Sequence, residues 1–403
     1  MKRFYITLLA IIAISATAFA TDGKQTTTPQ EDAPAQSEVQ TAPATDKIAE
    51  LEARLTKAEK RAATWEKVKQ YIKISGFVQA AYDWTDADNS STFHVRRARL
   101  DFKGDLYRGK KGAMVDYRFY FDLARIPKSS PILDMWVRYR PVKEFGVQFG
   151  QFKNKFSFEA SISPSKYDFI DYSYAVCRLA KNSSNDVLGI NMTARDFGIE
   201  FMGGFIHKEG YSVLNYNVAI LNGNGMNIKD NNKSKDIMAR LTVKPMKELA
   251  IAGYYQWGEN VLSAAKATEY GWTGSADYVT SHRWGGGLDY TTKKCFVRGE
   301  YIGGMTANLH SAGAYVSGGY KFYAQKMPGY AWLGAMVDYF ALDARNAKNN
   351  SDMRYMICAG YQPIKYVRLQ VAYSLEHHLG GYKMFKNNRP FCNTLKVLVT
   401  ASF

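Results

Sequence analysis

The sequence lacks the features that mark helical membrane proteins, disulfide-stapled secreted proteins and hydrolases. After residue 20, no apolar run approaches the about 20 residues that a membrane-spanning helix needs, so any membrane segment must be a strand. No GxSxG motif occurs and the six histidines are scattered, so we predict no enzyme, no metal site and no cofactor. The cysteines are far apart without CxxC spacing, and the sequence does not pair them: Cys177, Cys295, Cys358 and Cys392.

Proline is also scarce, with 11 residues among 403, whereas Tyr (28), Phe (22), Trp (7) and Gly (32) are abundant. This composition is typical of outer-membrane β-barrels, because only alternate residues of each strand face lipid and aromatic residues mark both interfaces. The formal net charge of +16 favours an anionic partner, whether nucleic acid, anionic lipid or small solutes.

The first 20 residues have the pattern of a secretory signal peptide. Lys2 and Arg3 precede an apolar run that ends in the small-x-small sequence Ala18-Phe19-Ala20. We therefore expect residues 1–20 to direct export, which makes nucleic acid the least suitable of the anionic partners. Together with the strand pattern below, this predicts a location in the outer membrane of a Gram-negative cell, in contact with its lipid.

Two segments separate this leader from the main domain. Residues 21–45 are rich in Thr, Pro, Gln and Ala and cannot build a core, which predicts a flexible linker. Residues 46–70 carry a heptad repeat in which each basic g position is followed five residues later by an acidic e position. This pattern predicts a short parallel coiled-coil helix and hence an oligomer, and a single amphipathic helix lying on its own barrel is the alternative. The a and d positions are Ile48, Leu51, Leu55, Ala58, Ala62 and Trp65.

Residues 71–403 contain sixteen segments with period-2 alternation, joined in turn by tight connections and longer polar ones. This asymmetry predicts a 16-stranded antiparallel transmembrane β-barrel. The segment 185–195 could be a further strand, but counting it would place the loop NGNGMNIKDNNKSK on the short-turn side. We therefore assign 154–196 to one long third loop, whose length favours folding into the lumen.

The stretch FHVRRARLDFKG, residues 93–104, raises the question of what its arginines face. In a regular strand Val95, Arg97 and Arg99 share one face, while Arg96 and Leu100 share the other. If Leu100 faces lipid, Arg97 and Arg99 face the lumen. The same alternation in the next two strands sends Leu133 outward and three more arginines inward, namely Arg118, Arg138 and Arg140.

Arginine keeps its charge and presents a planar fork to phosphate oxygens, and rings of basic residues make pores anion-selective. The five arginines therefore predict an electropositive wall beside the third loop. The alternative is that they pair with aspartates on the same strands, which would describe a general, weakly selective porin for small polar solutes. Those aspartates are Asp101, Asp116, Asp122 and Asp134.

Several motifs, in this order and spacing, resemble the phosphate-selective porin O and P family of Gram-negative outer membranes. They are RRARLDFKG, GQFKNKFSFE (150–159), RDFG (195–198), NVAILNGNG (217–225) and ARLTVKP (239–245). The resemblance implies a homotrimer of 16-stranded barrels whose inward-folded third loop and basic lumen select anions such as phosphate. It also implies that Arg97, Arg99, Lys153 and Lys155 lie on the anion pathway.

Overall fold

The computed structural model describes residues 44–109, 114–183, 185–189, 193–274, 278–379 and 389–403. The predicted signal peptide and nearly all of the predicted linker lie outside the described residues. Contacts divide the chain into two units, Met1–Arg61 and Ala62–Phe403. No helix that the structure describes is both long enough and apolar enough to cross a lipid bilayer.

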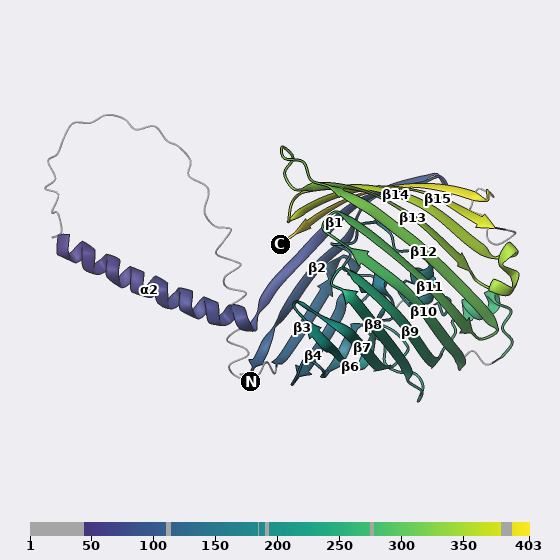
Figure 1. The fold of residues 1–403 in the computed structure, drawn as a ribbon, viewed down its shortest axis with the longest axis horizontal. Coiled ribbons are helices and arrows are strands. Elements are labelled where there is room, and N and C mark those ends of the chain that lie inside the picture. The colour runs from purple at the N-terminus through teal and green to yellow at the C-terminus, as the bar shows by residue number, and fades with distance from the viewer. Residues whose placement is uncertain (1–43, 110–113, 184, 190–192, 275–277, 380–388) are drawn as a thin grey trace. The chain divides into compact units, whose positions relative to one another are not determined.

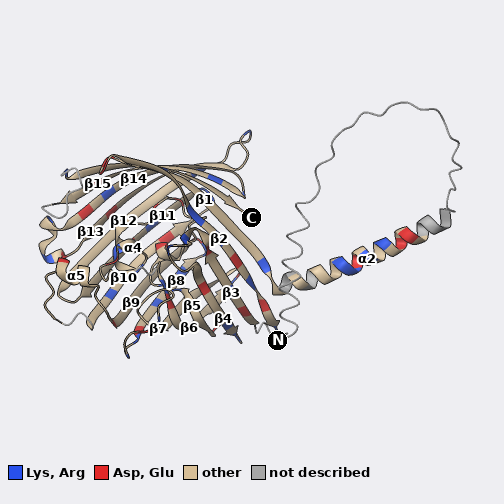
Figure 2. Ribbon diagram, turned by 180° about the vertical axis from the view of Figure 1, so that it is seen from behind, with Lys and Arg blue, Asp and Glu red and all other residues tan. Residues whose placement is uncertain are grey.

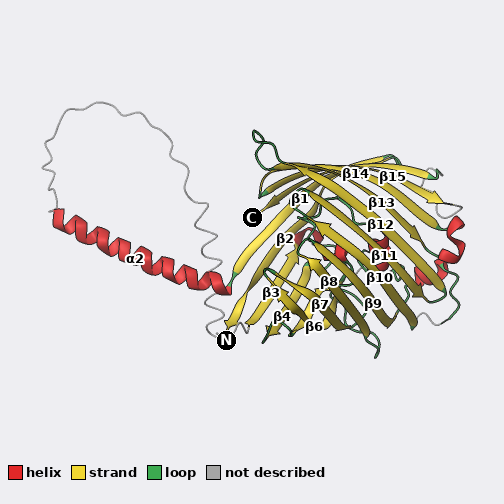
Figure 3. Cartoon of the chain, in the orientation of Figure 1, coloured by secondary structure: helices red, strands yellow, loops and turns green. Residues whose placement is uncertain are grey.

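One long helix, α2, occupies Ala44–Tyr71 (Figure 3). The helix predicted over 46–70 is therefore present and extends slightly at both ends. Leu51 and Leu55, which stand at the predicted heptad seam, are each 61% exposed in the single chain. The helix is confirmed, and its pairing with other copies stays a prediction.

Sixteen antiparallel strands form a closed barrel in which each strand pairs with its neighbours in sequence and β1 pairs with β16 (Figure 1). The predicted fold class is confirmed. The strands are β1 Lys73–Thr85, β2 Ser90–Arg108, β3 Met114–Asp122, β4 Ile132–Arg140, β5 Gly146–Lys153, β6 Arg195–Lys208, β7 Tyr211–Leu221, β8 Asp236–Met246, β9 Leu249–Asn260, β10 Val279–Thr291, β11 Cys295–Thr306, β12 Leu309–Phe322, β13 Tyr330–Ala341, β14 Ser351–Ile364, β15 Val367–Leu379 and β16 Phe391–Ser402.

The strands alternate between an apolar outer face and a largely polar inner face. In β13, Leu333 and Val337 are exposed on the outside, whereas Trp332, Met336 and Asp338 are buried inside. A lipid-facing surface needs apolar side chains, and closing the sheet leaves no unpaired strand edge in the bilayer. The alternation of apolar and polar residues in the sequence therefore reflects the alternation of lipid-facing and lumen-facing positions along each strand.

The third loop, residues 154–194, runs from the end of β5 to the start of β6, two residues short of the predicted limit. Segment 185–189 is described and forms no strand. Loop 3 contains α3 Phe158–Ser161 and α4 Tyr174–Leu179. Other loops hold the short helices η1 Leu123–Arg125, α5 Ala264–Glu269 and η2 Ala344–Asn349.

Loop 3 folds into the barrel, as predicted, because it carries its own apolar residues. Phe156, Leu179 and Leu188 are fully buried and belong to one hydrophobic cluster with Phe296 of β11 and Phe340 of β13. At about 25 cal/mol for each Å² of buried apolar surface, such side chains contribute a large part of the free energy that keeps the loop inside. The lumen is thus partly filled by a packed core.

Two β-bulges correct the predicted face assignments. In the β1–β2 ladder, Gln79 pairs with Arg97 and Ala80 pairs with Val95, so Arg96 is an extra residue. Arg96 therefore points into the lumen, where it meets Asp171 of loop 3, and Val95 is exposed on the outer face. The prediction that Arg96 faces outward with Leu100 and that Val95 faces inward with Arg97 was wrong, because an inserted residue resets the alternation.

The second bulge lies in β4. Tyr120 pairs with Asp134 and Phe121 pairs with Ile132, which leaves Leu133 without a partner on β3. Leu133 was predicted to face lipid, but it is fully buried and packs with Phe77 and Tyr120. Neither bulge contains Gly or Pro, so the residue letters give no local signal for them.

Candidate anion pathway

Loop 3 is held at its start by Glu300 on the inner face of β11. The two carboxylate oxygens of Glu300 accept hydrogen bonds from the backbone N–H groups of Phe158 and Glu159, at 2.9 and 2.8 Å. The hydroxyl of Ser157 donates to the same carboxylate, at 3.0 Å. Phe158 and Glu159 begin α3 and Ser157 is its N-cap, and at a helix N-terminus the unpaired N–H groups and the helix dipole favour a negative charge. Glu300 therefore fixes the place where loop 3 enters the lumen.

Salt bridges from the barrel wall hold the rest of the loop. Asp171 contacts Arg96 of β2 at 2.5 Å and Lys396 of β16 at 2.6 Å. Burial would raise the pKa of the Asp171 carboxyl, but Lys396 and Arg96 outweigh this effect and hold its pKa well below the usual range. Further pairs between wall and loop are Arg368–Asp168 at 2.9 Å, Arg283–Asp186 at 2.7 Å and Asp236–Lys181 at 2.5 Å.

A second buried carboxylate stabilises the fold of the loop itself. Glu159 accepts hydrogen bonds from the hydroxyl of Tyr167 and from the backbone and hydroxyl of Ser173. Burial raises the pKa of Glu159 from 4.5 to about 7, and the hydrogen bonds from Tyr167 and Ser173 limit this rise. The carboxyl thus joins the first turn of loop 3 to its middle, at Tyr167 and Ser173, and has no cationic partner among the described residues.

A cavity of about 300 Å³, here called the Arg97 cavity, lies between loop 3 and wall residues of β2, β5, β6, β14 and β16. Of the residues that the structure describes, eight basic ones and a single acidic one, Asp171, line it. The basic residues are Arg96, Arg97, Arg99, Lys153, Arg178, Arg195, Arg354 and Lys396.

Most of these cations are already paired with carboxylates. Arg99 contacts Asp122 at 2.9 Å, Arg195 contacts Asp134 at 2.7 Å and Arg354 contacts Asp338 at 2.6 Å. Arg97 instead donates to the amide oxygen of Gln79 at 2.9 Å, and Lys153 donates only to a backbone oxygen, at 3.4 Å. Among the described residues, Arg97 and Lys153 are therefore the cations of this cavity that no carboxylate neutralises.

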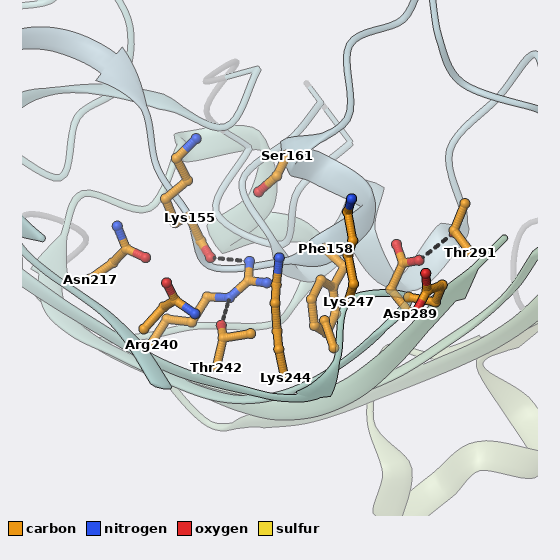
Figure 4. A pocket seen from close by; sticks show the side chains of 13 residues that line it. Lys155, Phe158, Ser161, Asn217, Arg240, Thr242, Lys244, Lys247, Asp289 and Thr291 are labelled. Atoms are coloured by element: carbon orange, nitrogen blue, oxygen red, sulfur yellow. Dashed lines mark hydrogen bonds between the residues drawn. The ribbon is translucent and has the colours of Figure 1, made fainter. Parts of the chain in front are cut away.

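A second cavity, of about 490 Å³ and here called the Lys155 cavity, lies at the short-turn end of β8 and β9 (Figure 4). The guanidinium of Arg240 stands over the Phe158 ring, 4.2 Å from its centroid, and donates to the backbone oxygen of Lys155 at 2.9 Å. Lys244 and Lys247 line the same cavity. In the described part of the chain, none of these four cations forms an ion pair with a carboxylate.

The remaining predicted residues lie on the barrel wall but line neither cavity. Arg118 bridges Asp101 at 2.7 Å and Asp134 at 2.9 Å. Arg138 contacts Asp116 at 2.5 Å, and Arg140 reaches the same carboxylate at 3.7 Å. Basic and acidic residues therefore alternate along this wall (Figure 2). The structure brings Arg97, Arg99 and Lys153 together, places Lys155 in the other cavity, and surrounds the remaining arginines with aspartates.

Sequence reasoning missed two groups of cations. Arg96 was predicted to face outward because the sequence does not reveal the β-bulge at this residue. Lys244 and Lys247 were not among the predicted residues, although Arg240, Thr242 and Lys244 recur at every second position and therefore share one face of β8. That spacing is the signal that could have located the Lys155 cavity.

No described group of His, Cys, Asp and Glu side chains could hold a metal ion, and the four cysteines are free thiols. The features that remain are an apolar outer face, a closed 16-stranded sheet, and a third loop folded into a lumen with basic cavities. Together they define a porin of the outer-membrane class.

The chain belongs to the phosphate-selective porin O and P family, whose model matches residues 68–379. No curated protein sequence matches the chain. Solved structures share its fold. The outer-membrane protein OmpT of Vibrio cholerae, in a trimer form, is 11% identical with a TM-score of 0.62, covering 82% of this chain and 99% of that one. An anion-selective porin from Comamonas acidovorans is 9% identical with a TM-score of 0.59 and the same coverage.

Proposed function

We propose that this porin is anion-selective and passes phosphate or related small anions by diffusion. The observation that carries the proposal is the position of its unneutralised cations. Arg97 and Lys153 line one cavity beside loop 3, and Lys155 and Arg240 line the other. Several weak sites in sequence suit conduction, because an ion must be attracted into the pore without being trapped there. The family and the anion selectivity stated for the Comamonas porin support this proposal.

Dissolved salt does not fully screen the attraction between the wall cations and a passing anion in a narrow pore. At ~0.1 M salt the Debye length is about 10 Å, so a pore of that radius or less lies within the field of its wall. Anion preference should therefore persist at ordinary salt and fade towards molar salt.

The second candidate function is a general porin for small polar solutes. The pairs of Arg118 and Arg138 with Asp101, Asp116 and Asp134 favour it, because they leave little net charge on that part of the wall. Planar-bilayer recording decides between the two. A reversal potential of anion sign across a potassium chloride gradient, with a chloride current reduced by added phosphate, supports anion selectivity. A reversal potential near zero supports the general porin.

We further propose that the mature chain begins near Thr21 and that the barrel assembles as a homotrimer, with residues 46–70 forming a parallel helical bundle. The exposed seam residues Leu51 and Leu55 support the bundle. Mass analysis of the purified N-terminus tests the first point. Deleting residues 21–70 should leave folded barrels that dissociate more readily in detergent, and unchanged association would contradict the bundle.

A further inference from the structure

The described turns at the short-turn end of the barrel form two arcs of different charge. At the turns after β4, β6 and β8, each lysine is followed directly by a glutamate, as in Lys143–Glu144, Lys208–Glu209 and Lys247–Glu248. At the turns after β10, β12 and β14, the lysines have no carboxylate beside them. These exposed lysines, which we call the basic arc, are Lys293, Lys294, Lys326 and Lys365. Every residue of these three turns is described, and none is acidic.

Tyrosines stand against two lysines of the basic arc. The ammonium of Lys293 lies 5.4 Å from the centroid of the Tyr323 ring, whose hydroxyl donates to the Lys293 backbone oxygen at 3.2 Å. The ammonium of Lys365 lies 4.7 Å from the centroid of the Tyr366 ring. Such cation–π contacts restrict where the ammonium groups lie while leaving them exposed. The basic arc is thus partly ordered by its own aromatic residues.

The outer apolar face of the barrel ends at this arc. Tyr320 and Phe322 of β12 are 45% and 48% exposed, their ring centroids lie 5.0 Å apart, and they immediately precede the β12–β13 turn. Ile364, which is 53% exposed, directly precedes Lys365. Aromatic and long basic side chains at the edge of an apolar face occupy the headgroup level of a bilayer. A soluble acidic partner would bind the lysines alone, and the apolar rings beside them would contribute nothing to that binding.

We propose that the basic arc binds the headgroup phosphates of anionic phospholipids in the leaflet at the short-turn end of the barrel. A lysine near a membrane surface raises the affinity for anionic lipid by about fivefold. In the three described turns of the opposite arc, the negative charge of the adjacent glutamate balances that of each lysine in sum, so these turns attract anionic lipid less. Anionic lipid should therefore gather along β10 to β15 rather than evenly around the barrel. The proposal is independent of anion conduction, because the four lysines line neither the Arg97 cavity nor the Lys155 cavity.

The test uses the full-length protein in phosphatidylcholine vesicles, with spin-labelled phosphatidylglycerol or phosphatidylcholine as probe. The wild type should associate with the phosphatidylglycerol probe at least about fivefold more strongly, and 1 M sodium chloride should remove the preference. The variant K293Q/K294Q should lose most of the preference, and adding K326Q and K365Q should bring the ratio close to one. The matched control K143Q/K208Q removes the same number of charges from the opposite arc and should keep the preference.

Three outcomes would overturn the proposal. They are equal binding of the two probes by the wild type, equal loss of preference in the two double variants, and displacement of the lipid probe by soluble polyglutamate. The variants should also show wild-type reversal potentials and heat-dependent gel migration, which separates a lipid effect from misfolding. If neither the wild type nor any variant is anion-selective, the proposed anion conduction is refuted, and the conclusion on lipid binding is unaffected.

Discussion

Lys153 and Lys155 are only two residues apart, yet their side chains line different cavities. In a continuous strand, residues at this spacing would share a face. Strand β5 ends at Lys153, however, and the chain then turns into loop 3. Because the backbone changes direction after Lys153, the side chains of Lys153 and Lys155 lie at two different positions along the lumen.

Replacing Arg97 and Lys153 together by Gln should lower the ratio of anion to cation permeability, because these two cations of the Arg97 cavity have no carboxylate partner in the described part of the chain. Folding should be unaffected, since neither change leaves an unpaired acid. Reversal potentials across a salt gradient measure the effect. An unchanged ratio would show that the Arg97 cavity lies off the conduction path.

Arg99→Gln should instead reduce stability. Arg99 and Asp122 are 8% and 4% exposed and form a salt bridge, so the substitution leaves a buried carboxylate unpaired. Breaking such a buried pair typically costs about 3–5 kcal/mol. We expect a lower unfolding temperature by heat-dependent gel migration and partial rescue by adding Asp122→Asn. Wild-type stability of the single variant would mean that water solvates Asp122.

Asp171→Asn should increase anion preference. Among the described residues, this carboxylate is the only one that lines the Arg97 cavity, and it neutralises both Arg96 and Lys396. Removing its charge adds the field of these two cations to that of Arg97 and Lys153. The measurement is the reversal potential, with conductance noise as a check on the mobility of loop 3. A shift towards cation preference would contradict the assignment of the pathway.

Glu159 should make the stability of loop 3 depend on pH. Burial raises its pKa from 4.5 to about 7, so between these values the folded loop binds a proton that the unfolded loop releases. Its stabilising contribution is fully present below pH 4.5 and is lost as the pH rises through about 7. Hydrogen exchange in loop 3 should respond accordingly. Glu159→Gln, compared at each pH to correct for intrinsic exchange rates, should abolish this dependence between pH 4.5 and 7.

Leu100→Arg should impair membrane insertion. Leu100 stands on the outer face of β2, between Arg99 and Asp101, which point inward. An arginine on the lipid face costs about 2–4 kcal/mol near the middle of the bilayer and less towards its surfaces. Refolding yield into lipid vesicles measures the effect, with Leu100→Ile as a control that keeps the side chain apolar. A yield equal to that of the control would place residue 100 at the membrane surface or in the lumen.

The pattern of residues along the chain is enough to predict the barrel. Alternation with period 2, the order of short and long connections, and the count of sixteen strands all arise locally, because each strand must present one face to lipid and one to the lumen. The same local logic placed loop 3 between β5 and β6 and turned Arg97, Arg99, Arg118, Arg138 and Arg140 inward. Apolar residues such as Phe156 and Leu179 within that loop also agree with its inward fold.

Which cations remain unneutralised depends instead on contacts that form in the folded chain. The partners of the lumen arginines come from neighbouring strands and from loop 3, so Arg99 meets Asp122 and Arg96 meets Asp171 across long stretches of sequence. Whether a charge is neutralised depends on distances of a few ångströms in the folded chain, and strand parity does not contain them. Bulges such as that at Arg96 also move a side chain to the opposite face. Composition therefore predicts a basic lumen, and the fold leaves some of its cations, Arg97, Lys153, Lys155 and Arg240 among them, without a carboxylate partner among the described residues.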